Sequence, residues 1–218
     1  MPKAAKPVRI VRESTVTAIE QRRMPTQARS RARLVSILAC AEAIIAERGS
    51  DRLRMADLAE AAAISIGSLY QYFPDKSAIL HALAARYNAG CRQSILGALR
   101  DVRDVPELRT AFTALMDQFY ALVRHNPVVR DIWAGMQADR TLAALQLDES
   151  RAMGALLAAT VTRVRPDADP AQLGVTCFLL WELGESTVRL AIASDVPTGA
   201  QMVAAYTRMA VTEMAGVQ

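Results

Sequence analysis

Apolar side chains recur at helical spacing along most of this chain, and the pattern is most informative between residues 55 and 72. The first part of that stretch has the i, i+3, i+4, i+7 spacing of a short helix with one buried face. Its apolar residues are Met55, Leu58, Ala59 and Ala62. Ser65 stands just before Ile66, where its oxygen can accept hydrogen bonds from the free amides of a second helix. Two short helices joined by about three residues predict a helix-turn-helix, and the second helix of that motif enters a DNA major groove.

A longer amphipathic stretch precedes this motif. It predicts a helix from about residue 27 to Arg48, ended by Gly49 and packed across the two short helices. Its apolar side consists of Leu34, Ile37, Leu38, Ala41, Ile44 and Ile45.

The remainder of the chain continues in helical periods, and it shows no strand pattern bounded by turn residues. Asp75 is placed to cap a helix of about 25 residues, which is long enough to join the motif to the rest of the chain. Further helices are predicted to begin near Pro106, Pro127, Leu142, Pro170 and Pro197. We therefore expect an all-α fold of about nine helices.

The segment from Leu173 to Ile192 is apolar on most sides, so it must be covered on two faces. One cover is the chain's own core, and the other is most simply a second copy of the chain. We therefore predict a homodimer through the last two helices, the eighth and the ninth. Gly174 and Gly184 either permit close approach at that interface or relieve crowding inside the subunit. Glu185 and Arg189, four residues apart, are interpreted as a pair on the helix surface.

The second short helix and the loop after it carry a more specific signature. In order the signature reads S-x-G-x-L-Y-x-Y-F-P-x-K, and it consists of Ser65, Gly67, Leu69, Tyr70, Tyr72, Phe73, Pro74 and Lys76. It resembles the signature of the TetR/AcrR family of dimeric bacterial transcriptional regulators. Asp57, Leu58 and Ala59 also match that family's D-[IL]-A. The resemblance is specific over roughly residues 27–80, and beyond them it rests on helix count.

The resemblance implies two domains. These are an N-terminal helix-turn-helix DNA-binding domain of three helices at residues 25–74 and a C-terminal helical domain for effector binding and dimerisation at residues 75–218. Residues 1–24 hold scattered basic residues with little apolar periodicity, and we interpret them as a disordered basic arm. Two positions depart from the family pattern: Arg54 stands where Thr is usual, and Ala63 where Gly is usual. Ala63 favours a turn that avoids positive φ, because Ala is strained there and Gly is not.

Positive charge is concentrated toward the N-terminal end. Residues 1–80 hold 13 Lys and Arg against 8 Asp and Glu, a balance of +5, while residues 81–218 hold 13 against 14, a balance of −1. An uneven soluble surface could produce the same asymmetry, but the excess coincides with the motif, as expected of an end that approaches phosphates. Arg29, Arg31 and Arg33 lie at the expected start of a helix. Cations there oppose the macrodipole, so we expect an anionic partner for them.

Contacts to DNA divide into those that position the protein and those that read bases. By resemblance, Tyr70, Tyr72 and Lys76 are expected to bind phosphates. Gln71 can pair with adenine, and Ile66 can touch a thymine methyl group. The predicted DNA-contacting residues are Arg29, Arg31, Arg54, Ser65, Ile66, Gly67, Ser68, Tyr70, Gln71, Tyr72 and Lys76.

The C-terminal domain is expected to hold a small apolar effector, because large soft side chains recur on its helices. These residues are Met116, Phe119, Tyr120, Trp133, Met136, Met153, Phe178 and Trp181. Taken singly, each of them fits an ordinary core residue better than a ligand contact. Gln118, His125 and Glu182 are the polar candidates. The resemblance implies that the effector pushes the helix that begins at Asp75 and so changes the separation of the two recognition helices.

Other classes of protein fit less well. His81 and His125 have no carboxylate or Cys at metal spacing, and no catalytic motif or phosphate-binding Gly loop occurs, so we expect no enzyme, cofactor or metal. Three scattered cysteines indicate reduced thiols and a cytoplasmic location, and no apolar run is long enough to span a membrane. The interpretation is a repressor that binds a palindromic operator as a dimer and is released by its effector. A dimeric interaction module, or an activator without a ligand, is the alternative.

Overall fold

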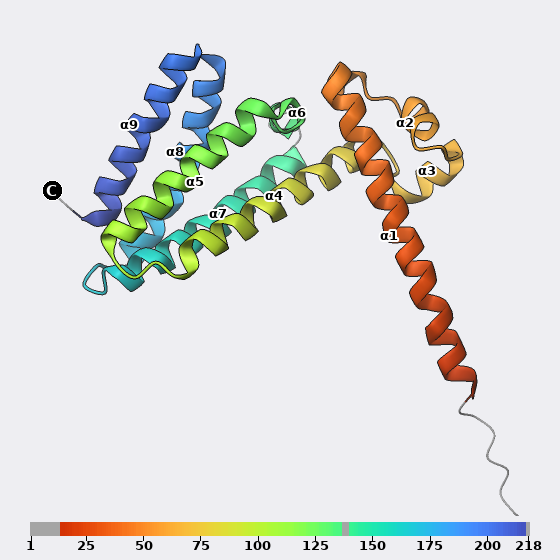
Figure 1. The fold of residues 1–218 in the computed structure, drawn as a ribbon, viewed down its shortest axis with the longest axis horizontal. Coiled ribbons are helices and arrows are strands. Elements are labelled where there is room, and N and C mark those ends of the chain that lie inside the picture. The colour runs from red at the N-terminus through yellow and green to blue at the C-terminus, as the bar shows by residue number, and fades with distance from the viewer. Residues whose placement is uncertain (1–13, 137–139, 217–218) are drawn as a thin grey trace, which may run out of the picture.

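The computed structural model describes residues 14–136 and 140–216, with side chains for residues 28–133, 143–144 and 146–216. Every regular element in this part of the chain is a helix, which confirms the all-α prediction (Figure 1). In chain order the elements are α1 (Ser14–Arg48), the 3-10 helix η1 (Ser50–Arg52), α2 (Met55–Ala61), α3 (Ile66–Tyr72), α4 (Lys76–Arg100), α5 (Val105–His125), α6 (Pro127–Met136), α7 (Arg140–Val164), α8 (Pro170–Ala193) and α9 (Val196–Ala215).

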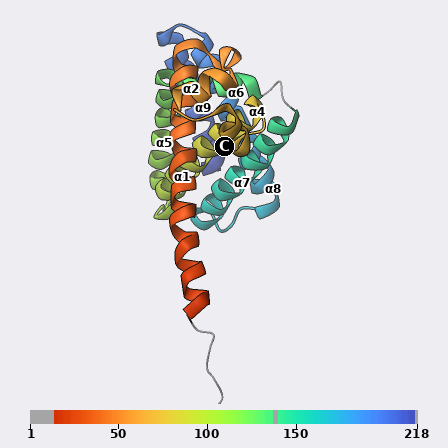
Figure 2. The same ribbon diagram turned by 90° about the vertical axis from the view of Figure 1, so that its right-hand side faces the viewer.

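The helices are divided between a head and a body. The head consists of α1, η1, α2, α3 and the first turns of α4, while the rest of α4 packs with α5 to α9 to form the body (Figure 1). Helix α6 also contributes to the head, because its Val128 and Ile132 belong to the head core. Figure 2, turned by a quarter, shows that α1 extends well beyond the other helices in this direction too. Because α4 belongs to both parts, a change in the body can reach the head along a single helix.

Separate apolar cores hold the two parts together. In the head, Ile37 of α1, Leu58 of α2 and Leu69 of α3 have no exposed surface, as the predicted stripes require. In the body, Val161, Cys177 and other side chains of α5, α7, α8 and α9 form the second core. Tyr87 and Trp133 pack against both cores, and so they join the head to the body.

Polar caps fix where several helices begin. The Ser65 hydroxyl accepts a hydrogen bond from the amide of Ser68 at 3.1 Å, and the Asp75 carboxylate accepts one from the amide of Ala78 at 2.8 Å. Both caps confirm the sequence prediction. Asp104, Asp169 and Asp195 cap α5, α8 and α9 in the same way. Such caps satisfy amides that have no partner inside the helix.

The beginning of α1 differs from the prediction. The helix starts at Ser14, not near residue 27, so residues 14–24 are helical and not a disordered arm. This stretch contains no Gly or Pro and is made of residues that a helix tolerates. The remaining residues of the predicted arm, 1–13, lie outside the described part of the chain. Arg29, Arg31 and Arg33 therefore lie far inside α1 and do not oppose the macrodipole at a helix start, contrary to the prediction.

The turn between α2 and α3 is a second correction. Ala63 has a φ of 52°, so this turn does adopt the positive φ that Ala was expected to avoid. The amide of Ile64 donates to the carbonyl of Ala59 at 3.0 Å, and the amide of Ala63 donates to that of Glu60 at 3.0 Å. These two bonds form a Schellman motif, which satisfies the last carbonyls of α2. Their formation offsets the strain at Ala63.

The last two helices leave apolar side chains uncovered. Val175, Leu179, Leu183 and Leu190 lie on one side of α8 and are 70%, 54%, 45% and 60% exposed. Their spacing of four, four and seven residues forms a continuous stripe. Gly184 faces Tyr206, whose hydroxyl oxygen would lie 3.1 Å from an added Cβ, so this glycine relieves crowding inside the subunit. An added Cβ at Gly174 would meet nothing within 4 Å.

Replacing Ala63 with Gly should stabilise the head. The left-handed conformation costs a non-Gly residue roughly 1–2 kcal/mol, and Gly does not bear that strain. We expect Ala63→Gly to raise the free energy of unfolding by about 1 kcal/mol, measured by urea unfolding at fixed protein concentration. Ala62→Gly is the matched control, since Ala62 has a φ of −83° and should lose stability. A loss of stability in Ala63→Gly itself would contradict this account of the turn.

Candidate DNA-contacting surface and effector cavity

Helix α3 separates buried and exposed side chains clearly. Leu69 has no exposed surface and Phe73, just after the helix, is 5% exposed, so both face the head core. On the opposite side Ile66 and Tyr70 are 44% and 51% exposed, and Gln71 is exposed as well. Large apolar groups on the outside of a seven-residue helix have no structural role in the isolated subunit. The arrangement therefore supports a contact surface.

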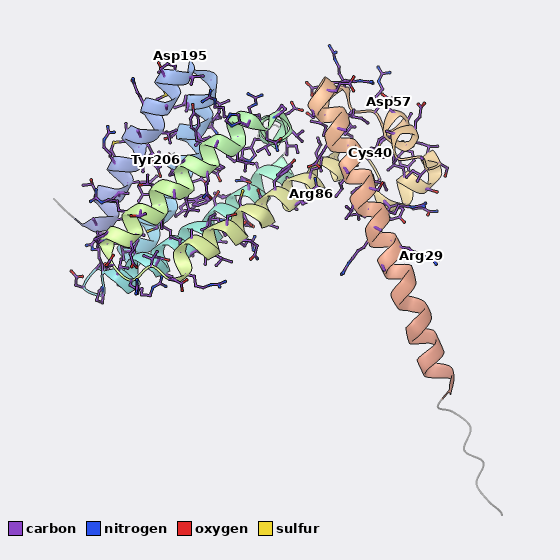
Figure 3. The ribbon with its side chains drawn as sticks, in the orientation of Figure 1. Arg29, Cys40, Asp57, Arg86, Asp195 and Tyr206 are labelled. Carbon is purple, nitrogen blue, oxygen red and sulfur yellow. The ribbon has the colours of Figure 1, made fainter. Side chains whose placement is uncertain are left out.

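The other predicted DNA-contacting residues occupy several parts of the head. Arg29, Arg31 and Arg54 are exposed, and Arg54 precedes α2 without making a side-chain cap. Figure 3 shows Arg29 on the long helix α1, well away from the body. Ser65 and Ser68 hydrogen-bond to each other at 2.9 Å through their hydroxyls. Tyr72 differs from the others because it packs partly against the head core.

Lys76 makes contacts within the subunit. Its ammonium group donates hydrogen bonds to the carbonyl oxygens of Ser50 and Asp51 at 3.3 and 3.4 Å. These bonds connect the start of α4 to η1. The phosphate contact expected of Lys76 remains a prediction, and it would have to share the ammonium group with these carbonyls.

Gly67 has no structural reason to be glycine. A Cβ added to it would meet nothing within 4 Å, and it lies inside α3 with no positive φ. Since packing within the subunit does not require a glycine here, we interpret Gly67 as a point where an external partner can approach the backbone closely.

The body contains a partly open cavity of about 450 Å³, a size typical of small-molecule sites. Helices α4 to α9 all contribute to its walls. Of the residues predicted to bind an effector, Met116, Phe119, Trp133, Met153 and Trp181 line this cavity, together with the polar candidate Gln118. The rings of Phe119 and Trp133 lie edge to face, with their centroids 5.1 Å apart.

The remaining candidates lie elsewhere. Tyr120 is directed toward Gly199, and Phe178 packs against Gly154 at the contact of α7 with α8. Neither residue lines the cavity, nor do His125 and Glu182. The side chain of Met136 lies outside the described residues.

Glu185 lies in the cavity wall and was misassigned from the sequence. Its carboxylate accepts hydrogen bonds from Trp181 Nε1 at 3.0 Å and from Gln146 Nε2 at 3.1 Å, while Arg189 donates to Ser186. The predicted surface pair of Glu185 and Arg189 is therefore wrong. Burial raises the pKa of Glu185 from 4.5 to about 7, with a further increase from the nearby Glu182. The signal available in the sequence was a second acid inside an otherwise apolar segment.

Two cavity residues also contact the head. Arg86 and Tyr87 of α4 line the cavity, and both bind the carboxylate of Glu42 on α1: Arg86 as an ion pair and Tyr87 through its hydroxyl. Figure 3 shows Arg86 where α4 passes between the body and the head. Asp131 of α6 adds a second connection by accepting a hydrogen bond from the amide of Ser50. The sequence contains no local signal for these contacts, because each joins residues far apart in the chain.

Burial disfavours the reactive form of two of the cysteines. Burial raises the pKa of the Cys91 thiol, with smaller contributions from Glu185 and Glu149, and burial alone raises that of Cys177 to about 11. Both shifts disfavour the reactive thiolate. Cys40 donates a weak hydrogen bond to the carbonyl of Ala61 at 3.4 Å.

The described residues contain neither a metal-ligand cluster nor a membrane-spanning helix. No group of three or more His, Cys, Asp or Glu side chains is placed there to hold a metal ion. None of the helices described is both long and apolar enough to cross a membrane.

A helix-turn-helix head joined to a helical body is the architecture of a class of DNA-binding transcriptional regulators, and comparison with known proteins identifies the family. Residues 37–83 match the family model described as bacterial regulatory proteins, tetR family, and residues 106–215 match the tetracyclin repressor-like C-terminal domain. The chain belongs to the TetR family of transcriptional regulators, which bind DNA.

Similar proteins agree with this assignment. The chain is 26% identical over 107 residues to the uncharacterized HTH-type transcriptional regulator YvdT of Bacillus subtilis (strain 168), a match that spans 49% of this chain and 54% of that relative. A TetR-family transcriptional regulator from Streptomyces coelicolor has the same fold, with a TM-score of 0.64, 24% identity and coverage of 86% of this chain and 97% of that one. The SmeT–triclosan complex is also similar, with a TM-score of 0.59, 21% identity and coverage of 84% and 90%.

The buried carboxylate should make stability depend on pH. The pKa of Glu185 is about 7 in the folded chain and 4.5 in the unfolded chain. Between pH 4.5 and pH 7 the folded chain therefore binds more protons than the unfolded chain. The contribution of Glu185 is fully favourable below pH 4.5 and is lost as the pH rises to about 7. We expect the free energy of unfolding of Glu185→Gln, taken relative to that of the wild type, to rise by on the order of 2 to 3 kcal/mol between pH 5 and pH 8.

Chemical unfolding at a series of pH values measures this difference. Asp117→Asn, at an exposed position of α5, is the control and should follow the wild type at every pH. Parallel pH profiles of the wild type and Glu185→Gln would contradict the raised pKa.

Proposed function

We propose that this chain is a repressor that binds a palindromic operator as a homodimer and is released when a small, mainly apolar effector enters the body cavity. The observation that carries the proposal is the position of that cavity. Two of its wall residues, Arg86 and Tyr87, are bonded directly to Glu42 of the DNA-binding head. A ligand that moves this wall must either break those bonds or move α1.

The exposed side of α3 is the proposed base-reading surface. The exposed Ile66 and Gln71 are proposed to reach base edges in the major groove, where Gln can pair with adenine and Ile can contact a thymine methyl. Tyr70 and Tyr72 on the same helix, with Lys76 at the start of α4, are proposed to hold phosphates. Such contacts set the register of the protein on DNA and carry no sequence information.

The exposed arginines would extend this surface. Arg29 and Arg31 of α1 and Arg54 before α2 are proposed to follow the DNA backbone. Their contribution should depend strongly on salt, because neutralised phosphates release counterions.

The apolar stripe on α8 is the proposed dimer interface. Val175, Leu179, Leu183 and Leu190 would be covered by the same stripe of a second copy, together with the exposed Met202 and Met209 of α9. A two-fold axis through such a patch makes it self-complementary. It also presents two copies of α3 to a DNA sequence of matching symmetry.

The cavity supports an effector of drug-like size. About 450 Å³ of space lies mainly between apolar and aromatic side chains, the environment in which such ligands bind. The structurally similar SmeT was determined as a complex with triclosan, which suggests that this architecture can enclose a compact aromatic molecule. We place the repressor and its effector in the cytoplasm.

Selection of bound fragments from random double-stranded DNA tests the proposal. A dimer with two recognition helices should enrich a palindrome whose half-sites lie about 34 Å apart, one turn of the double helix. Enrichment of no palindrome at low ionic strength would reject the proposed function. A monomer in sedimentation analysis would reject the dimer through α8 and α9.

Gly67→Ala should separate folding from DNA binding. The added methyl group meets no atom of the subunit, and replacing Gly by Ala inside a helix stabilises it by about 0.5 kcal/mol or more. If α3 approaches DNA at this point, affinity for the selected palindrome should fall by about tenfold, which corresponds to 1.4 kcal/mol. Fluorescence anisotropy with labelled DNA measures the change.

Gly97→Ala on α4 is the matched control. Its Cβ also meets nothing within 4 Å, but it lies far along α4 from the head. Its affinity for DNA should equal that of the wild type. Unchanged affinity in Gly67→Ala would remove this residue from the contact surface.

A further inference from the structure

The charged groups of the cavity wall are not equivalent. Four such residues line it: Arg86, Arg92, Glu149 and Glu185. Arg86 is paired with Glu42. Arg92 forms a two-pronged ion pair with Glu149, with 3.0 Å between Arg92 Nε and Glu149 Oε1. The hydrogen bonds described for Glu185 come only from the neutral groups of Trp181 and Gln146.

The surroundings of Glu185 concentrate negative charge. Glu182 on the same helix raises the pKa of Glu185. Arg189 lowers that pKa, but its effect is the smallest among the neighbouring groups. Glu149 of α7 and Glu185 both raise the pKa of the Cys91 thiol on α4, so the two carboxylates act on the same part of the cavity. Burying a carboxylate without a cation is unfavourable. A positive group entering the cavity beside Glu185 would remove that penalty.

The rest of the wall is suited to the apolar part of such a ligand, and its aromatic rings are suited to contact with the charged group. Phe112, Phe119, Trp133, Trp181 and Tyr206 all line the cavity. Aromatic faces carry partial negative charge and attract cations, most strongly where water is excluded. Trp181 adjoins Glu185 directly, since its indole nitrogen is hydrogen-bonded to that carboxylate. An acid and an aromatic ring therefore adjoin at the same end of the cavity.

We propose that the effector is a lipophilic amine, an apolar body of aromatic size that carries one protonated nitrogen beside the carboxylate of Glu185. This inference rests on the proposed function for the role of the cavity, and it adds the chemical class of the ligand. A carboxylate ligand would meet Glu185 as a like charge, whereas Glu149 is already paired with Arg92. A neutral ligand would leave Glu185 uncompensated.

Binding of such an amine should strengthen as Glu185 loses its proton. The titratable and charged groups that face Glu185 are Glu182 and Arg189 on α8, Glu149 on α7, and Cys91 on α4. With a pKa near 7 for Glu185, affinity for the amine should rise between pH 6 and pH 8. Affinity for a neutral analogue should stay constant over the same range.

Three fluorescent probes with one apolar body test the proposal: 1-pyrenemethylamine, 1-pyrenemethanol and 1-pyrenecarboxylate. In the full-length protein at pH 8, the amine should bind at least about tenfold more tightly than the alcohol, and the carboxylate should bind least. Glu185→Gln should lower the affinity for the amine to that of the alcohol and remove the rise with pH. It should leave affinity for the alcohol unchanged.

Glu182→Gln is the matched control. It removes the same charge from the same helix at a residue outside the cavity wall, so the preference for the amine should persist within about threefold. Equal binding of the amine and the alcohol, tightest binding of the carboxylate, or no binding of any probe would overturn the proposal. A preference for the amine that survives in Glu185→Gln would overturn it too.

Release of the selected DNA, measured with the same probes, separates this inference from the proposed function. Amine-selective binding that never weakens DNA binding supports the ligand class and rejects effector-driven release. Release by the alcohol and the amine at equal concentrations supports effector-driven release and rejects the ligand class.

Discussion

The contact of Glu42 with Arg86 and Tyr87 is the interaction on which the regulatory architecture depends. It joins α1 of the head to α4 at the point where α4 also forms the cavity wall. The side chains of Arg86 and Glu42 are 39% and 25% exposed, so the ion pair alone is worth only about 0–1 kcal/mol. Its importance lies in its position, because Tyr87 and Trp133 pack against both cores around it.

This junction makes the two cores interdependent. Trp133 contacts Phe119 in the cavity, and Asp131 on the same helix α6 holds the amide of Ser50 in the head. Helix α6 therefore offers a second connection beside the one expected through α4. Coupling between effector and DNA sites is typically worth 1–3 kcal/mol, which a few such contacts of moderate strength can supply.

Much of the fold could be predicted from the sequence because it depends on local chemistry. The stripes of α1 and α2 and the caps at Ser65 and Asp75 are decided within a few residues. The structure has them as predicted, except that Leu34 of the α1 stripe is 37% exposed and lies outside the head core. Ala63 was misjudged because two backbone hydrogen bonds outweigh its strain. The start of α1 was misplaced because sparse apolar periodicity does not exclude a helix.

The candidate site was less predictable, since it depends on tertiary contacts. Large apolar residues could be assigned to the body, but whether Phe119 faces the cavity and Phe178 faces α7 depends on the packing of several helices. Glu185 was interpreted as exposed because Arg189 lies one turn away, yet Trp181 and Gln146 hold it in the wall. Burial in the wall makes the charged form of this carboxylate unfavourable, which is why its pKa is raised to about 7.

The most direct test of the account measures how strongly the cavity and the head are coupled. The affinity for the selected DNA would be determined with and without saturating 1-pyrenemethylamine, in the wild type and in Glu42→Gln. The account predicts that the amine weakens DNA binding of the wild type by at least about tenfold, and that this factor falls by threefold or more in Glu42→Gln while the amine still binds. An identical factor in both proteins would contradict the claim that this junction carries the signal.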